Sequence, residues 1–356
     1  MTNNGTTPPA AAEAATSINV EELFELLDTP APSGYERPAA EVFCRIGRTF
    51  TDDVRTDAIG NAIVTVNAGA GPRVMLGGHL DEIGFVVTKV EATGQLRFGQ
   101  VGGWDPAVPV GQRVRILTAD GEIAGALGRR PPHQIPPGER NVELKDLWVD
   151  IAARDRDHAL ELVRPGDPMV IDASPVRIGE HHVMSRSVDN RLGCYVALEV
   201  ARRAVGLGVE VVAVGTVSEE TNQIGALTSA YGLEPWRALV VDSTPANDVP
   251  GDGDGDMDLG KGPAVTFGAS TRSAIGSQLL AVAETHGIDV QIEAAGRSTN
   301  SDADEVVTAG AGVVTGLLSV PTRYLHTPVE LFDLRDAEAA IDLAVHWLRD
   351  VCQAGD

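Results

Sequence analysis

The feature that most limits the fold of this chain is the alternation of strand-like and helix-like segments after residue 173. Apolar runs of strand length recur there between segments that have the period of an amphipathic helix. We expect strands at 209–217, 238–241, 289–293 and 312–318, and helices at 189–204, 226–231, 275–286 and 336–351. This alternation predicts an α/β domain, in which helices cover both faces of a mostly parallel or mixed sheet.

A segment of different character interrupts the pattern between residues 83 and 172. Short stretches of alternating apolar and polar residues are separated there by turns rich in glycine and proline, which is typical of a small β-barrel. We therefore expect one α/β domain made of residues 17–82 and 173–356, with a β-rich module of residues 83–172 inserted into it. Residues 1–16 form a polar tract without an apolar signal region, so we expect a disordered leader.

The charge and the cysteines exclude several classes of function. The formal net charge is −23, whereas a nucleic-acid-binding protein needs a basic surface to replace counterions. The same charge argues against an anionic membrane, and no apolar run reaches the roughly 20 residues that cross a bilayer. The three cysteines are scattered and show no CxxC spacing. We therefore expect a cytoplasmic protein with neither a nucleic-acid nor a membrane partner.

Acidic or imidazole side chains follow four of the apolar segments that we expect to be strands. They are His79 and Asp81 after 73–76, Glu219 and Glu220 after 209–217, Asp242 after 238–241, and His326 after 312–320. Asp189 is a further candidate, because it opens the helix expected at 189–204. Sites in open α/β sheets form beyond the carboxyl ends of the strands, so we expect these side chains to converge.

Each candidate also has an ordinary structural explanation when it is taken alone. Asp189 is most simply a helix N-cap, a single histidine is usually a core or surface residue, and paired glutamates usually lie on a solvated face. Glu219 and Glu220 differ from such a pair, because neighbouring residues of a strand point to opposite sides. A site is favoured because every candidate lies at the end of an element and none lies in the middle of a face.

The chemical types in this set suit a site for two divalent metal ions. Imidazole nitrogens and carboxylate oxygens are ligands of Zn²⁺, with Co²⁺ and Mn²⁺ as alternatives. One shared carboxylate would give each ion three protein ligands from the set His79, Asp189, Glu220, Asp242 and His326. Asp81 can orient His79 by accepting its second ring N–H. Glu219 is not needed as a ligand and can therefore serve as a general base.

Other motifs fail the requirements of the sites that they resemble. Residues 255–261 have the spacing of a phosphate-binding loop, but Gly262 stands where a Ser or Thr is required. The acidic loop 252–258 begins like a calcium loop and lacks its central glycine and closing glutamate. We expect an exposed loop there, whose role the sequence leaves open. The chain also has no Gly-x-Ser-x-Gly nucleophile motif.

Nine short motifs, in the right order along nearly the whole chain, resemble those of the tetrahedral (TET-type) metallo-aminopeptidases of clan MH, which include glutamyl and deblocking aminopeptidases. They lie at 31–36, 78–85, 102–104, 128–133, 187–191, 218–220, 241–245, 260–263 and 323–330. The resemblance implies a zinc-peptidase-like catalytic domain with an inserted dimerisation domain. It also implies an enzyme that hydrolyses N-terminal residues from peptides.

The resemblance assigns roles at the matching positions. It implies that Asp189 bridges the two ions, that His79 and Asp242 complete one ligand set, and that Glu220 and His326 complete the other. It further implies that Glu219 is the base and that Asp81 orients His79. Self-association to a dimer, and from there to a hollow dodecamer, is expected from the family alone.

Two further residues are candidates for a role at the substrate, each from a single feature of the sequence. His133 lies in the inserted module and is a candidate for a contribution to the site of a neighbouring subunit. Asp302 aligns with the acid of a Gly-Thr-Asp-Ala motif that reads Thr-Asn-Ser-Asp-Ala here, and it is a candidate to bind the substrate's α-amino group. Residues 221–226 also depart from the Val-Gly-x-x-Gly-Ala pattern that usually follows Glu220.

These departures border the substrate pocket and leave the preferred N-terminal residue open. The physiological metal and the size of the oligomer are open as well. The negative net charge of the chain disfavours acidic peptides as substrates. Two alternatives keep the metals and change the substrate, namely removal of acyl groups from amino acids and cleavage of carboxy-terminal residues. A non-catalytic peptide-binding shell is a third alternative, which the intact set of ligands and base disfavours.

Overall fold

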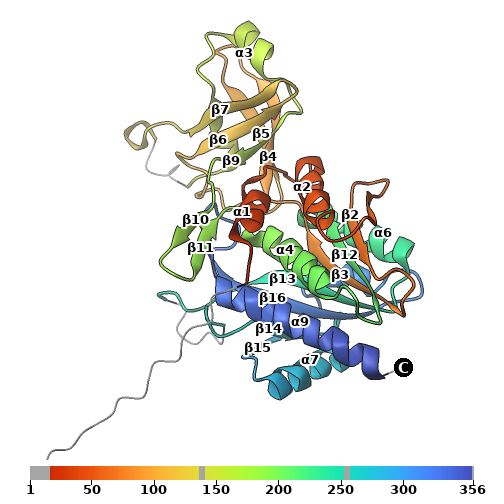
Figure 1. Cartoon of the computed structure of the whole chain (residues 1–356). Helices are drawn as coiled ribbons and strands as arrows, with labels where there is room; N and C mark the ends of the chain where they lie inside the picture. The colour runs from red at the N-terminus through yellow and green to blue at the C-terminus, as the bar shows by residue number, and fades with distance from the viewer. Residues whose placement is uncertain (1–16, 136–140, 252–256, 355–356) are drawn as a thin grey trace, which may run out of the picture.

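The computed structural model describes residues 17–135, 141–251 and 257–354. The expected leader at 1–16 and most of the acidic loop 252–258 therefore lie outside the described residues. Figure 1 shows a large sheet covered by helices and, at the other end of the molecule, a smaller barrel. No helix in these three ranges combines the length and the apolar character that a membrane span requires.

The large sheet has a parallel centre and antiparallel edges. Its central strands are parallel and run in the order β12 (Glu210–Thr216), β3 (Arg73–His79), β13 (Arg237–Pro245) and β16 (Val314–Arg323). Antiparallel edges are formed by β2 (Ala62–Val66) and β1 (Val54–Thr56) on one side, and by β17 (Glu330–Asp333), β11 (His182–Ser185) and β10 (Val176–Ile178) on the other. Two further strands, β14 (Ala264–Phe267) and β15 (Gln291–Ala294), branch from β16. The expected α/β architecture is confirmed, as a mixed sheet.

Successive residues of the central strands face two different apolar layers. In β12, Val211 and Ala213 belong to one layer, whereas Val212 and Val214 belong to the other. The first layer contains α1 (Val20–Asp28), α2 (Arg37–Gly47), α4 (Val188–Arg203), α7 (Ser273–His286) and α9 (Leu334–Ala354). The second contains α6 (Ile224–Leu233) and α8 (Ala303–Val306). The strand period of two residues thus places helices on both faces, as the sequence pattern predicts.

The β-rich module is a closed antiparallel barrel. Its strands run in the order β4 (Gly84–Val90), β5 (Leu96–Val101), β8 (Trp148–Asp150), β7 (Gly121–Gly128), β6 (Arg113–Thr118) and β9 (Pro168–Ile171). Its own core includes Phe85, Leu96, Ile116 and Met169, and α3 (Arg156–Leu162) adds Ala159 to it. Because β3 ends at His79 and β4 begins at Gly84, the barrel starts a few residues beyond the end of a central strand.

A glycine lets β3 lie directly against α4. A Cβ atom at Gly78 would be 2.6 Å from the backbone nitrogen of Cys194, which is closer than any side-chain carbon tolerates. The absence of a side chain at Gly78 therefore sets the spacing between the two elements. This spacing matters because His79 ends β3 and Asp189 lies at the start of α4.

Candidate metal centre

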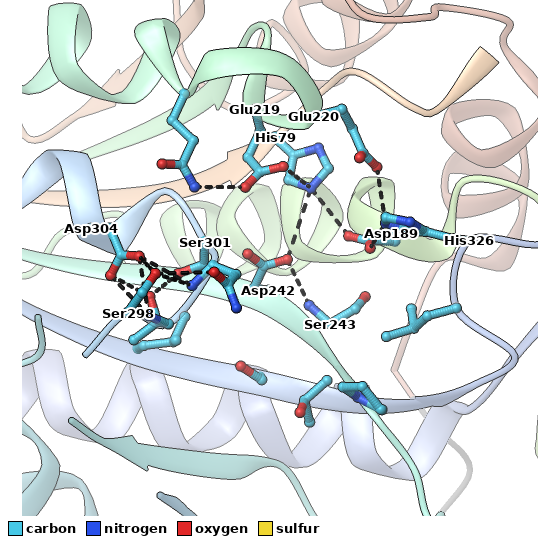
Figure 2. Close-up of a pocket in the computed structure, with 18 of the residues that line it drawn as sticks. His79, Asp189, Glu219, Glu220, Asp242, Ser243, Ser298, Ser301, Asp304 and His326 are labelled. Carbon is cyan, nitrogen blue, oxygen red and sulfur yellow. Dashed lines mark hydrogen bonds and ion pairs between the residues drawn. The ribbon is translucent and has the colours of Figure 1, made fainter. Parts of the chain in front are cut away.

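The strand ends bring five of the predicted side chains together. His79 ends β3 and Asp242 lies in β13, while Glu220 belongs to α5 (Glu219–Asn222), which follows β12 after two residues. Asp189 lies in the first turn of α4, and His326 lies in the loop between β16 and β17. Figure 2 shows these side chains pointing toward one another. The parallel arrangement of β12, β3 and β13 causes this convergence, because their carboxyl ends share one edge of the sheet.

The five side chains form two sets that share Asp189. In one set, the Nε2 atom of His79 is 3.1 Å from Asp189 Oδ1 and 3.9 Å from Asp242 Oδ1. In the other, the Nε2 atom of His326 is 3.6 Å from Asp189 Oδ2 and 3.6 Å from Glu220 Oε1. Asp189 thus directs one carboxylate oxygen to each histidine.

These distances fit the ligand shell of a small divalent cation. Three ligands at about 2.0–2.2 Å from a tetrahedral ion are about 3.3–3.6 Å from one another. In each set, one nitrogen and two carboxylate oxygens all lie within 4.8 Å of one another. Nitrogen and oxygen donors of this kind suit Zn²⁺, Co²⁺ and Mn²⁺. Each set can therefore hold one such ion after small movements of the side chains.

Asp81 supports this centre in a broader way than the sequence suggested. The Nδ1 atom of His79 is 3.1 Å from the backbone oxygen of Asp81 and 3.5 Å from its carboxylate. The two carboxylate oxygens accept hydrogen bonds of 3.0 Å from the backbone N–H groups of Glu219 and Glu220. Asp81 therefore orients His79 mainly through its carbonyl, while its side chain fixes the start of α5.

Two buried glutamates hold the neighbouring loops, and sequence reasoning gave neither of them a role. Glu330 accepts hydrogen bonds from the backbone N–H groups of Asp189, at 3.1 Å, and of His326, at 2.9 Å. Glu36 accepts one from the backbone N–H of Ser218, at 3.0 Å. Both lie at the ends of motifs that carry the family resemblance, and that position was the only signal for them in the sequence.

Glu219 lies close to His79 and Gln223. One of its carboxylate oxygens accepts a hydrogen bond of 3.0 Å from the side-chain amide of Gln223, and the other is 3.8 Å from His79 Nε2. Glu219 also forms a possible ligand set with His79 and Glu220. Its side chain lines the cavity described below, so it can reach a bound substrate.

Burial and mutual repulsion dominate the electrostatics of these acids. Burial, together with the charge of Asp189, raises the pKa of Glu220 and of Asp242 well above the usual range. Burial also raises the pKa of Glu219. For His79, burial lowers the pKa, but the charge of Glu219 and the hydrogen bonds of Asp189 and Asp81 outweigh this effect and raise it well above its usual value. The carboxylates thus lack compensating positive charge, which divalent cations supply.

Asp302 does not lie in the cavity wall, contrary to its expected contact with the substrate. Its side chain is buried beneath the wall, where the hydroxyl of Thr216 lies within hydrogen-bond distance of both Asp302 Oδ2 and the carbonyl oxygen of Gly78. Burial and the charge of Glu219 raise the pKa of Asp302 to about 8. A protonated Asp302 resolves the competition for the single hydrogen of Thr216, because its own O–H can then donate to that hydroxyl.

His133 lies far along the chain from the described centre and does not line its cavity. It lies in the turn Pro132–Gln134 of the barrel module, and its side chain is exposed. Within this chain it contacts none of the five converging side chains, so any contribution to catalysis requires a second subunit.

A cavity of about 610 Å³ opens beside the centre. Its wall contains His79, Asp189, Glu220, Asp242 and His326, and it continues along residues 221–223, 243–245 and 298–301. Figure 2 shows Ser298, Ser301 and Asp304 beside Asp242, on the side away from His326. The cavity is large enough for an amino-acid side chain next to the five converging side chains.

Comparison with known proteins shows consistent similarities. The sequence model of the M42 glutamyl aminopeptidase family matches residues 60–343. The lysyl aminopeptidase of Pyrococcus furiosus is 30% identical over 339 residues, which cover 94% of this chain and 98% of that protein. The TET aminopeptidase of Thaumarchaeota archaeon SCGC AB-539-E09 is 30% identical and superposes with a TM-score of 0.89 over 95% of this chain and 99% of its own. The TET1 peptidase of Pyrococcus horikoshii, which can assemble into a tetrahedron or a large octahedral shell, is 32% identical with a TM-score of 0.82 over 92% and 98% of the two chains.

Proposed function

This chain belongs to the M42 glutamyl aminopeptidase family and is an aminopeptidase, and from this premise we propose that it uses two divalent metal ions and Glu219 as general base. The observation that carries the proposal is the sharing of Asp189 between two complete ligand sets. A single-metal site would leave one histidine and one carboxylate without a partner ion. In the described cavity, both sets face the same space.

The five converging residues divide the work of holding the ions. His79 and Asp242 hold one ion with Asp189, and Glu220 and His326 hold the other with the same aspartate. We take Zn²⁺ as the most suitable ion, with Co²⁺ and Mn²⁺ as alternatives. Bound there, the ions would supply a Lewis acid for the scissile carbonyl and would lower the pKa of a water molecule toward about 7.

Glu219 handles the proton in this mechanism. Its carboxylate faces the cavity, and the amide of Gln223 holds one of its oxygens, so the other is free to accept a proton from the attacking water. The same carboxyl group then delivers that proton to the nitrogen of the leaving amine. Burial raises the pKa of Glu219 above its usual value, and a carboxylate beside the attacking water can act as a general base.

Substitution of the base tests the proposal. In Glu219→Gln we expect kcat on an aminoacyl anilide to fall by about 10²- to 10⁴-fold, because the amide cannot accept the proton. The metal content, measured by mass spectrometry on the purified protein, should stay at two ions for each chain. Glu284→Gln on the exposed face of α7 is a matched control and should keep full activity. Full activity in Glu219→Gln with both ions bound would contradict the assignment of Glu219 as the general base.

The barrel is the part of the chain that we propose for self-association. It is a separate closed unit with its own core, and the P. horikoshii relative assembles into large shells. We propose a dimer formed through residues 83–172 and a dodecamer built from such dimers, in the cytoplasm. Light scattering on the full chain measures the mass directly, and a monomer at micromolar concentration would contradict the proposal.

A further inference from the structure

We infer that the cavity beside the metal centre selects peptides whose first residue has a cationic side chain, with Glu293 as the residue that recognises the charge. This inference rests on the proposed two-metal function, since it names the substrate class of the same site. It is carried by the charges that line the cavity and by the hydrogen bonds of Glu293.

The cavity has an unbalanced negative charge even when the metals are counted. Two divalent ions are balanced by four carboxylates of the centre, which belong to Asp189, Glu219, Glu220 and Asp242. Two more acids, Glu293 and Asp304, also line the cavity. Among the described residues, its wall contains no lysine or arginine, and its only imidazoles are those of the two metal-site histidines. An acidic substrate side chain would therefore meet repulsion and find no cationic partner.

Glu293 is placed to act on a substrate side chain. It lies on β15, half-buried, opposite Thr266 of β14. Its Oε1 accepts a hydrogen bond of 2.6 Å from the hydroxyl of Thr244, and its Oε2 accepts one of 2.6 Å from the hydroxyl of Thr266. Thr244 follows Asp242 by two residues in β13, so the two side chains point to the same face of the sheet, about 7 Å apart along the strand.

This distance suits a long side chain whose α-carbon is held near the ions. A lysine or arginine carries its charge at the end of a flexible three- or four-carbon stem. The two threonine hydroxyls fix the carboxylate of Glu293 and supply no positive charge. Each oxygen keeps a further lone pair that can accept a hydrogen bond from an ammonium or guanidinium group.

Asp304 is less suited to this role, although it lines the same cavity. Its oxygens accept hydrogen bonds from the hydroxyls of Ser298 and Thr299 and from the backbone N–H groups of Thr299 and Asn300. These bonds use its acceptor capacity to shape the loop 298–304. Asp304 therefore adds negative potential to the cavity, while Glu293 is the acid that remains available to a ligand.

The experiment compares three anilides on the full chain loaded with Zn²⁺ or Co²⁺. Lysyl, norleucyl and glutamyl p-nitroanilides have side chains that are cationic, neutral and anionic. We expect kcat/KM to fall in that order, with lysine favoured over norleucine by about tenfold or more at low ionic strength. In Glu293→Gln this lysine-to-norleucine ratio should fall about tenfold, whereas Glu284→Gln should leave the ratio unchanged.

A measurement on the unaltered chain keeps the inference testable if Glu293→Gln does not fold. The lysine-to-norleucine ratio should fall as the salt concentration rises from 0.01 M to 1 M, because the Debye length shrinks from about 30 to about 3 Å. Equal rates for lysine and norleucine, or a preference for glutamate, would overturn the inference. If the metal-loaded chain cleaves none of the three anilides, the proposed function fails and the inference falls with it. Cleavage of all three without an order of charge overturns the inference alone.

Discussion

The two histidines of the metal centre are held in very different ways. His79 ends a central strand and its side chain is 2% exposed, whereas His326 lies in a loop with its side chain 42% exposed. His79 is held by the backbone oxygen of Asp81, two residues away. His326 has a positive φ of 58°, and its Nδ1 atom is 3.0 Å from the carbonyl oxygen of Gly103, which follows the barrel strand β5. One half of the centre is therefore part of the sheet, and the other half depends on contacts between loops.

The difference indicates that the His326 side of the proposed centre can vary more freely than the His79 side, although both sides share Asp189. The His79 set contains residues of the central strands β3 and β13 together with the shared Asp189, so we expect a change in its geometry to cost stability. The His326 set depends on Gly103, on Glu330 and on the loop after β16. Its affinity for metal can change while the fold remains intact.

Removal of each histidine gives the largest expected effect and tests most directly whether the two histidines are held differently. Both His79→Ala and His326→Ala should lose about 10³-fold in rate, because each loses several kcal/mol of charge stabilisation in the transition state. Only His79→Ala should also destabilise the metal-free fold, by about 1–3 kcal/mol, because it removes a buried side chain that contacts Asp189 and Asp81. Chemical unfolding measured in chelator separates the two variants. Equal destabilisation of the two variants would show that His79 contributes no more to the stability of the fold than His326 does.

The next effect is a pH dependence of folding stability that Asp302 causes. Asp302 is buried next to the His79 side of the centre. Its pKa is raised to about 8 in the folded protein, first by burial. The folded state therefore holds this proton more tightly than the unfolded chain does, and stability is lost as the pH rises from about 4 toward 8. Asp302→Asn should gain stability relative to the unaltered protein over that range, reaching a few kcal/mol at pH 8. Unfolding curves at pH 5, 6.5 and 8 measure this trend, and a constant difference between the two proteins would contradict it.

A smaller effect is expected from Glu330→Gln, which acts on the shared Asp189 as well as on His326. The amide keeps the size of the side chain but can accept only at its oxygen, so one of the N–H groups of Asp189 and His326 loses its partner. We expect metal affinity to fall by about 10- to 100-fold, with activity restored by excess metal. Titration of the metal-free protein with Zn²⁺ measures the affinity. Unchanged affinity for both ions would show that Glu330 does not position the ligands.

The smallest effect is expected from Gly103→Ala, which tests the contact of the barrel module with His326. The added Cβ atom would lie 3.4 Å from the Nδ1 atom of His326, at the near limit of ordinary van der Waals contact, and the ring can adjust by a small movement. We expect affinity for one ion to fall several-fold, at a cost below about 1 kcal/mol. The affinity of the His79 set should not change. Weakening of both sets would show that the two halves are coupled.

The sequence was informative wherever a residue's role follows from its position at the end of a strand. His79 and the pair Glu219 and Glu220 were found in this way, because the carboxyl ends of parallel strands meet at one edge of the sheet. Asp242 was found by the same reasoning, although β13 continues beyond it to Pro245. Glu330 could not be found by the same reasoning, since its role consists of two contacts, one of them to a residue 141 positions away. Asp302 aligned with a family motif, yet alignment does not tell toward which side a side chain points.

The sequence by itself determined the α/β class, and it predicted a β-rich module at 83–172 and a set of converging side chains. These properties depend on the local period of apolar residues and on the order of segments, and both can be read directly from the amino-acid sequence. Only the tertiary structure decided that Asp189 faces both histidines, that Asp302 is buried behind the wall, and that Glu293 reaches the cavity from β15. The physical reason is that side-chain direction and burial arise from packing between distant segments, which no single segment specifies.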